Sequence, residues 1–109
     1  IAAYLAREDN DVTIIDKNPA IIGEINDELD VNGICGYASH PDVLDQAGAN
    51  DADMIIAVTR SDEVNMVACQ VAHSLFNVPR KIARVRDRAY LEPAWSNLFS
   101  RMHMPIDTI

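Results

Sequence analysis

The sequence contains no long run of apolar residues, and none approaches the roughly 18 residues that a membrane-spanning helix needs. A secretory leader is not indicated either. The segment Ile1–Arg7 is a short apolar stretch that acids follow, without a basic start or a cleavage pattern. We therefore expect a cytosolic protein that does not insert into a bilayer.

Cysteine is scarce, because Cys35 and Cys69 are the two in the chain. They are too few and too far apart for a disulfide framework, and each sits in an apolar stretch, so we expect buried, reduced thiols. The three histidines (His40, His73 and His103) show no metal-ligand spacing with either cysteine. No metal site is expected.

Positive charge is also in short supply, since nine lysines and arginines face 17 aspartates and glutamates and the net charge is −8. This balance argues against nucleic acid binding through bulk electrostatics. Six of the nine basic residues lie after Pro79, whereas 14 of the acids precede Val64. The separation indicates either an anionic ligand or partner surface late in the chain, or a solvated basic strand and helix.

A catalytic constellation is not apparent. Asp62, Glu63 and Asn65 lie close together, but no nucleophile with a base, no carboxylate pair facing a histidine and no ligand triad accompanies them. Acids in the first turn of a helix are common because the helix dipole favours them. We expect no active site here.

Short apolar segments typical of β-strands recur along the chain. Met54–Thr59 is almost continuously apolar, as is typical of a strand buried on both faces of a parallel sheet. Lys81–Arg86 alternates more, like a strand nearer an edge. The other predicted strands are Val12–Asp16, Val31–Gly36 and Met104–Ile109.

Helices are predicted between these strands from their start and stop residues. Their starts are Asn18-Pro19, His40-Pro41 and Ser61, the last as the cap of the longest helix. The buried stripe predicted for this longest helix consists of Val64, Val67, Ala68, Val71, Ala72 and Leu75. A final helix is expected over Tyr90–Phe99, interrupted early by Pro93.

Strict alternation of strands and helices with short loops predicts crossover connections. The expected fold is α/β and Rossmann-like: a doubly wound parallel sheet with helices on both faces, in three layers. No linker, repeat or low-complexity tract divides the sequence, so residues 1–109 are expected to form a single domain.

The start of the chain is unusual for such a fold, which normally opens with a strand and a glycine-rich turn. Ile1–Arg7 has the pattern of the second half of a first helix, and Asn10-Asp11 would make the turn into Val12. We therefore expect a Rossmann-like domain that is truncated at its N-terminus.

Several ordered segments resemble the TrkA family of cytosolic potassium-transport regulators, whose nucleotide-binding domains are also called RCK or KTN domains. The most specific of them is Ser61–Gln70 (SDEVNMVACQ). The others are Asp11–Asp16, Gly36–Leu44, Ala47–Thr59 and Lys81–Arg86. The likeness covers almost the whole chain, while the G-x-G-x-x-G loop of the family would precede Ile1 and is absent from the sequence.

A nucleotide site is predicted at the carboxyl ends of the strands. Asp16 ends the second strand of the family's fold, where an acid accepts hydrogen bonds from both ribose hydroxyls and repels a 2′-phosphate. The alternative for Asp16 is a turn-initiating aspartate. Lys17 follows at the same place, either as a phosphate-attracting cation or as a solvated lysine. Thr59 and Ser61 lie at the rim of the expected crevice, and Ser61 also suits helix capping.

The resemblance adds three residues and the ligand class. It places the adenine ring beside Tyr37 and Ala38, although an aromatic residue after a strand is equally often a core residue. It also implies that Arg84 reaches a phosphate or ribose, against the alternative of an exposed strand arginine. The implied regulatory ligand is NAD(H) or ATP/ADP, and no catalytic residue is implied.

The resemblance further implies a regulatory function. Members of the family lie on the cytosolic face of the cell membrane, peripheral to it, and gate a TrkH-like membrane potassium transporter subunit through paired, oligomeric RCK domains. Tyr90, Leu91 and Trp95 are candidates for an apolar pairing surface, with a core position as the alternative for Trp95. Two other functions remain open: an NAD-dependent dehydrogenase domain, and an assembly scaffold that binds no ligand.

A missing first strand would leave a gap between the strands of Asp16 and Met54, because that strand normally lies between them. Unpaired backbone groups would line the gap. Three resolutions of the gap are open. Either the chain closes the gap by re-pairing its own strands, or two copies of the chain fill it together, or further residues of the protein fill it.

Overall fold

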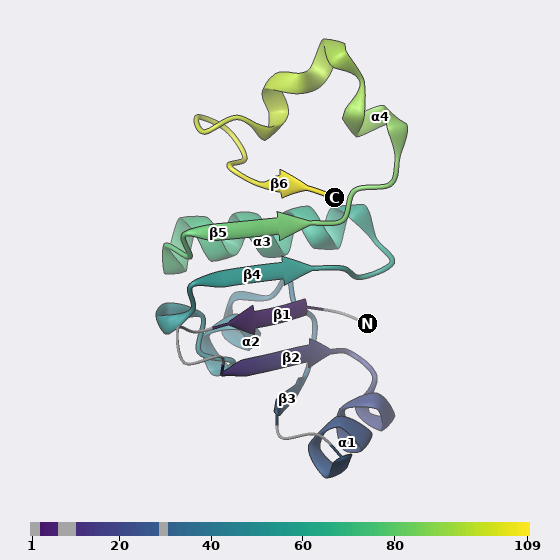
Figure 1. Cartoon of the computed structure of the whole chain (residues 1–109), viewed down its shortest axis with the longest axis vertical. Coiled ribbons are helices and arrows are strands. Elements are labelled where there is room, and N and C mark those ends of the chain that lie inside the picture. The colour runs from purple at the N-terminus through teal and green to yellow at the C-terminus, as the bar shows by residue number, and fades with distance from the viewer. Residues whose placement is uncertain (1–2, 7–10, 29–30) are drawn as a thin grey trace.

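The computed structural model of the chain describes residues 3–6, 11–28 and 31–109. Its strands form one sheet in the order β3-β2-β1-β4-β5-β6, which is the strand order of a Rossmann fold. Helices lie against this sheet (Figure 1), so the predicted α/β, Rossmann-like class is confirmed. The strands are β1 (Ala3–Ala6), β2 (Val12–Asp16), β3 (Asn32–Cys35), β4 (Met54–Ala57), β5 (Arg80–Ala83) and β6 (Asp107–Thr108).

The helix predicted over Ile1–Arg7 is wrong for residues 3–6, which form strand β1, while residues 1, 2 and 7 lie outside the described part. β1 runs antiparallel to both neighbours, and Leu5 pairs with Thr13 on β2 and with Ile55 on β4. Burial in β1 has a period of two, since Ala3 and Leu5 are buried and Tyr4 is half-buried. The segment thus supplies hydrogen-bond partners to backbone groups of β2 and β4. The free energy gained from this pairing outweighs the helical propensity of the segment.

The gap expected beside Asp16 is therefore filled by the chain's own first segment, the first of the three predicted resolutions. The sheet is mixed as a result, and the expectation of a wholly parallel sheet is wrong at β1. The remaining pairs, β2–β3, β4–β5 and β5–β6, are parallel as predicted.

Helices cover the two faces of the sheet in the three-layer arrangement that the sequence predicts. α1 (Pro19–Glu28) packs beside β2 and β3 on the face of the sheet that carries Ile14. This face is identified by Gly33, the partner of Ile14, because a side chain at position 33 would contact Ile22 of α1. Successive strand residues face opposite sides. Ile15 accordingly belongs to the opposite core, with α2 (Pro41–Gln46), the short 3₁₀ helix η1 (Ala49–Asp51) and α3 (Asp62–Phe76).

The buried stripe of α3 differs from the predicted one. Val67 and Leu75 are 45% and 59% exposed, whereas Asn65, Met66 and Cys69 are buried. The helix is rotated relative to the purely apolar stripe because Asn65 finds hydrogen-bond partners in the interior. A buried polar side chain is tolerated when it is paired in this way.

The segment after β5 forms two short helices, α4 (Arg88–Leu91) and the 3₁₀ helix η2 (Pro93–Phe99), in place of one helix. Proline at position 93 has no backbone N–H and interrupts the regular helix. This segment lies beyond the edge of the sheet next to β6 (Figure 1). Trp95 is 60% exposed, so its alternative as a core residue is wrong.

Both cysteines are free, as predicted, but Cys35 is exposed on the edge strand β3 and only Cys69 is buried. The prediction of burial is wrong for Cys35, which is the last residue of a strand at the edge of the sheet. None of the helices in the described residues is both long and apolar enough to cross a membrane.

Candidate functional site

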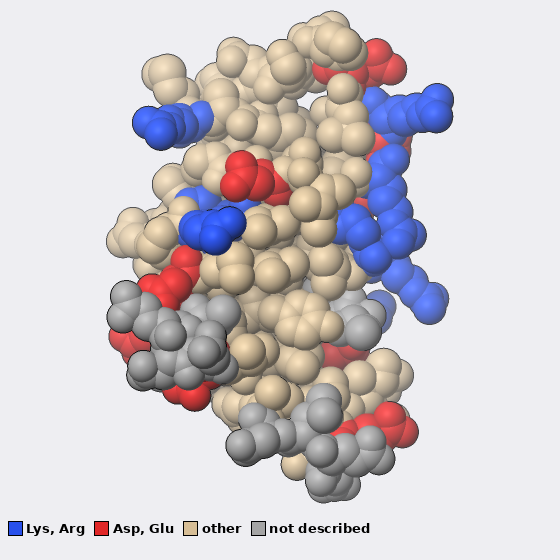
Figure 2. Space-filling view, in the orientation of Figure 1, with Lys and Arg blue, Asp and Glu red and all other residues tan. Residues whose placement is uncertain are grey.

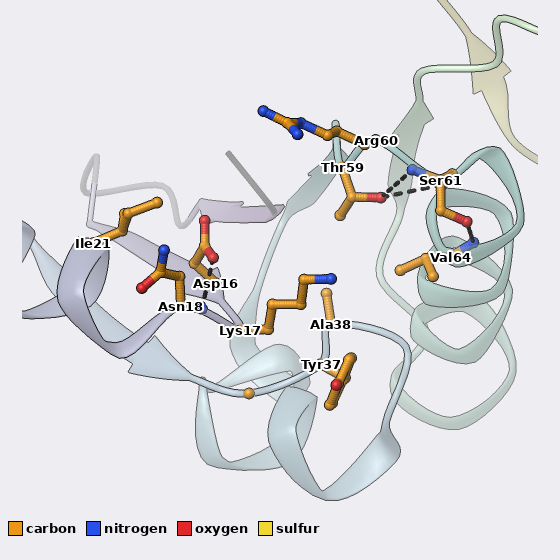
Figure 3. Close-up of a pocket in the computed structure, with 11 residues that line it drawn as sticks. Asp16, Lys17, Asn18, Ile21, Tyr37, Ala38, Thr59, Arg60, Ser61 and Val64 are labelled. Atoms are coloured by element: carbon orange, nitrogen blue, oxygen red, sulfur yellow. Dashed lines mark hydrogen bonds between the residues drawn. The ribbon is translucent and has the colours of Figure 1, made fainter.

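A cavity of about 470 Å³ opens where β2, β3 and β4 end (Figure 3). The carboxyl ends of parallel strands at the switch in strand order are the usual ligand crevice of such sheets, and the volume lies within the range of small-molecule sites. The lining residues are Asp16, Lys17, Asn18, Ile21, Gly36, Tyr37, Ala38, Thr59, Arg60, Ser61 and Val64.

Six of the seven residues predicted for the site line this cavity: Asp16, Lys17, Tyr37, Ala38, Thr59 and Ser61. They come from the ends of β2, β3 and β4; β2 and β3 are neighbours in the sheet, and β1 lies between β2 and β4. Arg84, the seventh, is not among the lining residues. The structure thus brings most of the predicted site together, whereas the ligand itself stays a prediction.

Asp16 is the last residue of β2 and its side chain is only 7% exposed. Its Oδ1 accepts the backbone N–H of Asn18 over 2.9 Å, which is the turn-initiating role that the sequence allows. Figure 3 shows the second carboxylate oxygen pointing away from this bond. The turn therefore fixes the carboxylate and still leaves one oxygen for a ligand in the cavity.

Lys17 and Tyr37 are the exposed members of the predicted set. The Lys17 side chain extends across the cavity floor toward the side of Thr59 (Figure 3). Tyr37 is 54% exposed, so it does not fill the core, and its ring packs on that of His40 with 5.2 Å between centroids. Ala38, next to it, is buried and forms a small, apolar part of the wall.

Thr59 and Ser61 form the opposite wall, between β4 and α3. The Thr59 hydroxyl donates to Oδ1 of Asn65 over 2.6 Å, and its oxygen also lies 3.1 Å from the carbonyl of Ser61. Ser61 caps α3, because its Oγ accepts the N–H of Val64 over 3.2 Å. The capping role predicted for Ser61 is confirmed, and both hydroxyls are held by the protein.

Arg84 follows β5, and its guanidinium turns toward the backbone of the β4 end. Nη2 donates to the carbonyls of Val58 and Thr59, each over 2.7 Å. Arg84 is half-buried, so the alternative of a freely exposed strand arginine does not describe it. It lies behind the cavity wall and braces it.

Sequence reasoning missed five lining residues. Arg60 was the most accessible of them to prediction, because it stands between Thr59 and Ser61 and adds a cation to the crevice. Gly36 closes the end of β3, where a Cβ would lie 2.8 Å from Cγ2 of Val43. No local pattern indicates the others, which are Asn18, Ile21 and Val64.

A second, more polar cavity of about 570 Å³ lies beside the first and shares Arg60 and Ser61 with it. Its other lining residues are Asp62, Glu63, Arg86 and Asp87. The Asp62 carboxylate is engaged there by the N–H groups of Arg86 and Asp87, at 3.0 and 2.7 Å. The first turn of α3 thereby holds the segment that follows β5.

Basic side chains gather along the side of the molecule toward which β4 and β5 point (Figure 2). Arg60, Arg84, Arg86 and Arg88 all follow the ends of these two strands. In contrast, Lys81 is 7% exposed, and its ammonium group donates to the carbonyl of Val78 over 2.9 Å. The expectation of a solvated basic strand is therefore wrong at Lys81.

Within the described residues, no three side chains of histidine, cysteine, aspartate or glutamate come together in a way that would hold a metal ion. The polar side chains that line the cavity are instead the carboxylate of Asp16, the amide of Asn18, three hydroxyls (Tyr37, Thr59 and Ser61) and the cations of Lys17 and Arg60. This set suits a ligand that offers hydroxyl groups and negative charge.

Comparison with known proteins gives one family. The sequence profile described as the TrkA-N domain matches residues 1–104. The Trk system potassium uptake protein TrkA of Azorhizobium caulinodans is 60% identical over 109 residues, which cover 100% of this chain and 24% of that protein.

Proteins of the same name from two other bacteria are also similar. That of Halomonas elongata is 51% identical over 100% of this chain and 23% of its own length. That of Vibrio alginolyticus is 49% identical over 98% of this chain and 23% of its length. The chain thus spans about a quarter of the length of the curated relatives that it matches.

Proposed function

Because the chain belongs to the TrkA-N domain family, we propose that it is the nucleotide-binding regulatory domain of a Trk-type potassium uptake system. The observation that supports this function is the cavity itself, where Asp16 and Lys17 from the end of β2 meet Thr59 from the end of β4. NAD(H) or an adenine nucleotide is the proposed ligand, bound without chemical conversion.

The adenosine half of the ligand lies between β2 and β3 in this proposal. Asp16 accepts hydrogen bonds from the ribose hydroxyls through its second oxygen, which favours ligands without a 2′-phosphate. The adenine ring lies along Ala38, and the half-exposed ring of Tyr37 covers its edge. The other half of the ligand extends toward Thr59 and Ser61, at the start of α3.

The regulatory step requires a ligand that binds one arrangement of the assembled protein better than another. We propose that the domain pairs with further copies through the exposed apolar side chains of Leu91 and Trp95, 47% and 60% exposed. The assembly lies on the cytosolic face of the membrane and gates a TrkH-like potassium transporter subunit. The names of the relatives, potassium uptake proteins, support this partner class.

Calorimetric titration with NADH, NAD, ATP and ADP tests the proposal. Asp16→Asn is the informative variant, because it keeps the acceptor for the Asn18 N–H while it replaces the charged oxygen that faces the ribose. We expect binding to weaken about tenfold or more. Asp45→Asn, on the exposed surface of α2 and outside the cavity, is the matched control and should bind like the unaltered protein.

Two outcomes would redirect the assignment. Absence of binding for all four nucleotides would favour the assembly scaffold. Turnover of NAD with small hydroxy acids would favour a dehydrogenase. Potassium uptake by cells that carry Asp16→Asn then tests regulation separately, with loss of nucleotide control but intact protein as the expected result.

A further inference from the structure

The first turn of α3 contacts two different parts of the molecule. Ser61 and Val64 line the cavity, and the Ser61 Oγ accepts the N–H of Val64 over 3.2 Å (Figure 3). Asp62 and Glu63 stand between these two residues in sequence and are not among the lining residues of this cavity. Both acids instead accept hydrogen bonds from the segment that follows β5.

Asp62 fixes the start of that segment. Its Oδ2 accepts the backbone N–H groups of Arg86 and Asp87, over 3.0 and 2.7 Å. Asp87 in turn caps α4, because its Oδ1 accepts the N–H of Ala89 over 2.9 Å. The carboxylate of Asp62 therefore determines where α4 begins.

Glu63 holds α4 at a second point. Its Oε2 accepts the hydroxyl of Tyr90 over 3.0 Å, and the half-buried ring of Tyr90 packs against the main core. The two adjacent acids of α3 thus bond α4 at its N-cap and again at its third residue. Together they fix both the position and the direction of this short helix.

The segment that these acids hold has little other burial. Residues 86–89 and 91–97 are exposed, and the segment lies beyond the edge of the sheet (Figure 1). It carries Leu91 and Trp95, the pairing surface of the proposed function. Because segments with few buried contacts open easily, hydrogen bonds to Asp62 and Glu63 weigh heavily in keeping the pairing surface in one place.

We infer that the first turn of α3 couples the cavity to the pairing surface, and that Asp62 and Glu63 are the positioning residues of this coupling. A ligand that contacts Thr59 and Ser61 orders the start of α3 and thereby stabilises the two carboxylates that hold α4. The inference rests on the proposed function and specifies how an occupied cavity acts on assembly. Because coupling is reciprocal, loss of the contacts with α4 also weakens ligand binding.

Hydrogen exchange of the whole chain, with and without ligand, tests the coupling. The ligand is whichever of NADH, NAD, ATP and ADP binds most tightly in the calorimetric titration. The informative amides are those of Ala89 and Tyr90, which bond to Asp87 and line neither cavity. We expect saturating ligand to slow their exchange about fivefold or more.

Two variants remove the connection from opposite sides. Tyr90→Phe deletes the hydroxyl that Glu63 accepts, and Asp62→Ala deletes the acceptor for the start of the segment. In each we expect saturating ligand to slow the exchange of amides 89 and 90 less than about twofold, and ligand affinity to fall about fivefold. General stabilisation by a bound ligand persists in both variants, so it does not account for this difference.

The controls separate the hydrogen bond from the charge. Glu63→Gln keeps an acceptor for the Tyr90 hydroxyl and should retain the effect of the ligand. Asp42→Ala, in the first turn of α2, removes an acid elsewhere and should behave like the unaltered protein. If Asp62→Ala fails to fold, Tyr90→Phe, which changes one hydroxyl, still decides the question.

Three results would count against these assignments. Ligand binding without any slowing at amides 89 and 90 overturns the coupling, and so does equal slowing in Tyr90→Phe, Asp62→Ala and the unaltered protein. Both results leave the proposed function standing, because the ligand binds. Absence of binding for all four nucleotides overturns the proposed function and the coupling with it. The titration therefore distinguishes the two failures.

Discussion

The hydroxyl of Thr59 donates to Oδ1 of Asn65 over 2.6 Å, and the same oxygen accepts the backbone N–H of Thr59 over 2.8 Å. Asn65 is fully buried, and its Nδ2 returns a hydrogen bond to the carbonyl of Thr59. A polar residue in the core of α3 thus positions a residue of the cavity wall. Its contribution to the fold is testable apart from ligand binding.

Replacement of Asn65 by leucine, which has a similar volume, should lower the free energy of unfolding by about 3 kcal/mol. The substitution removes the Asn65 partner of the Thr59 N–H and of the Arg84 carbonyl, while the Thr59 carbonyl keeps its hydrogen bond from Arg84. Urea denaturation measures the effect. Asn50→Leu, at an exposed position, should change stability by no more than about 0.5 kcal/mol. Equal stability of the two variants would contradict this role for Asn65.

Asp62→Ala should loosen the connection between β5 and α4. The carboxylate accepts the N–H groups of Arg86 and Asp87, over 3.0 and 2.7 Å. Its loss should lower stability by about 1–2 kcal/mol. Hydrogen exchange should accelerate at those two amides while the amides of β2 keep their protection. Asp42→Ala, in the first turn of α2, is the control, and unchanged exchange in Asp62→Ala would refute the prediction.

The two cysteines should differ strongly in reactivity. Burial raises the pKa of the Cys69 thiol to about 12, and the positive charge of Lys81 offsets only part of this effect. The thiolate is the reactive form. We therefore expect a thiol reagent at neutral pH to label Cys35, which is exposed, and to reach Cys69 only after unfolding. Rapid labelling of folded Cys35→Ser would show that Cys69 is accessible.

Tyr90 gives a pH-dependent prediction. Its hydroxyl donates to Oε2 of Glu63 over 3.0 Å, and this hydrogen bond is the main cause that raises the pKa of Tyr90 above its ordinary value of 10.0. The folded state then favours the neutral phenol, so this contribution to stability is complete below pH 10.0 and declines as the pH rises through the folded-state value.

Glu63→Ala should move the ionisation of Tyr90 to lower pH, because the hydrogen-bond acceptor and the nearby negative charge are both removed. An alkaline titration followed by tyrosine absorbance measures the shift. Glu92→Ala, which removes an exposed acid that does not bond Tyr90, is the control. Identical titration curves for the Glu63 and Glu92 variants would contradict the assignment.

Much of the fold follows from local patterns in the sequence. The continuous apolar character of Met54–Ala57, the helix starts at Pro19 and Pro41 and the cap at Ser61 place most elements within a few residues. The failure at Ala3–Ala6 has a physical cause, since helical propensity is local whereas its pairing with β2 and β4 depends on strands that are distant in sequence. The rotation of α3 is equally non-local, because it depends on partners that Asn65 finds at Thr59 and Arg84.

The candidate site was predictable to the extent that it depends on strand ends. Asp16, Thr59 and Ser61 end or follow predicted strands, and parallel strands bring their carboxyl ends to one edge of the sheet. The direction of the Arg84 side chain was not predictable, because the backbone carbonyls of Val58 and Thr59, just after β4, determine it. The resemblance to a family indicated a cation there, but only the structure separates Arg84 from Arg60.

The most direct test of nucleotide binding in this cavity is an NMR titration of the protein with NADH, followed through its backbone amide signals. The largest changes should fall at the three strand ends that line the cavity: residues 16–18, 36–38 and 59–61. Such a pattern would place the ligand between Asp16 and Thr59. Saturable changes confined to other residues, or none at NADH concentrations in the millimolar range, would contradict the central claim.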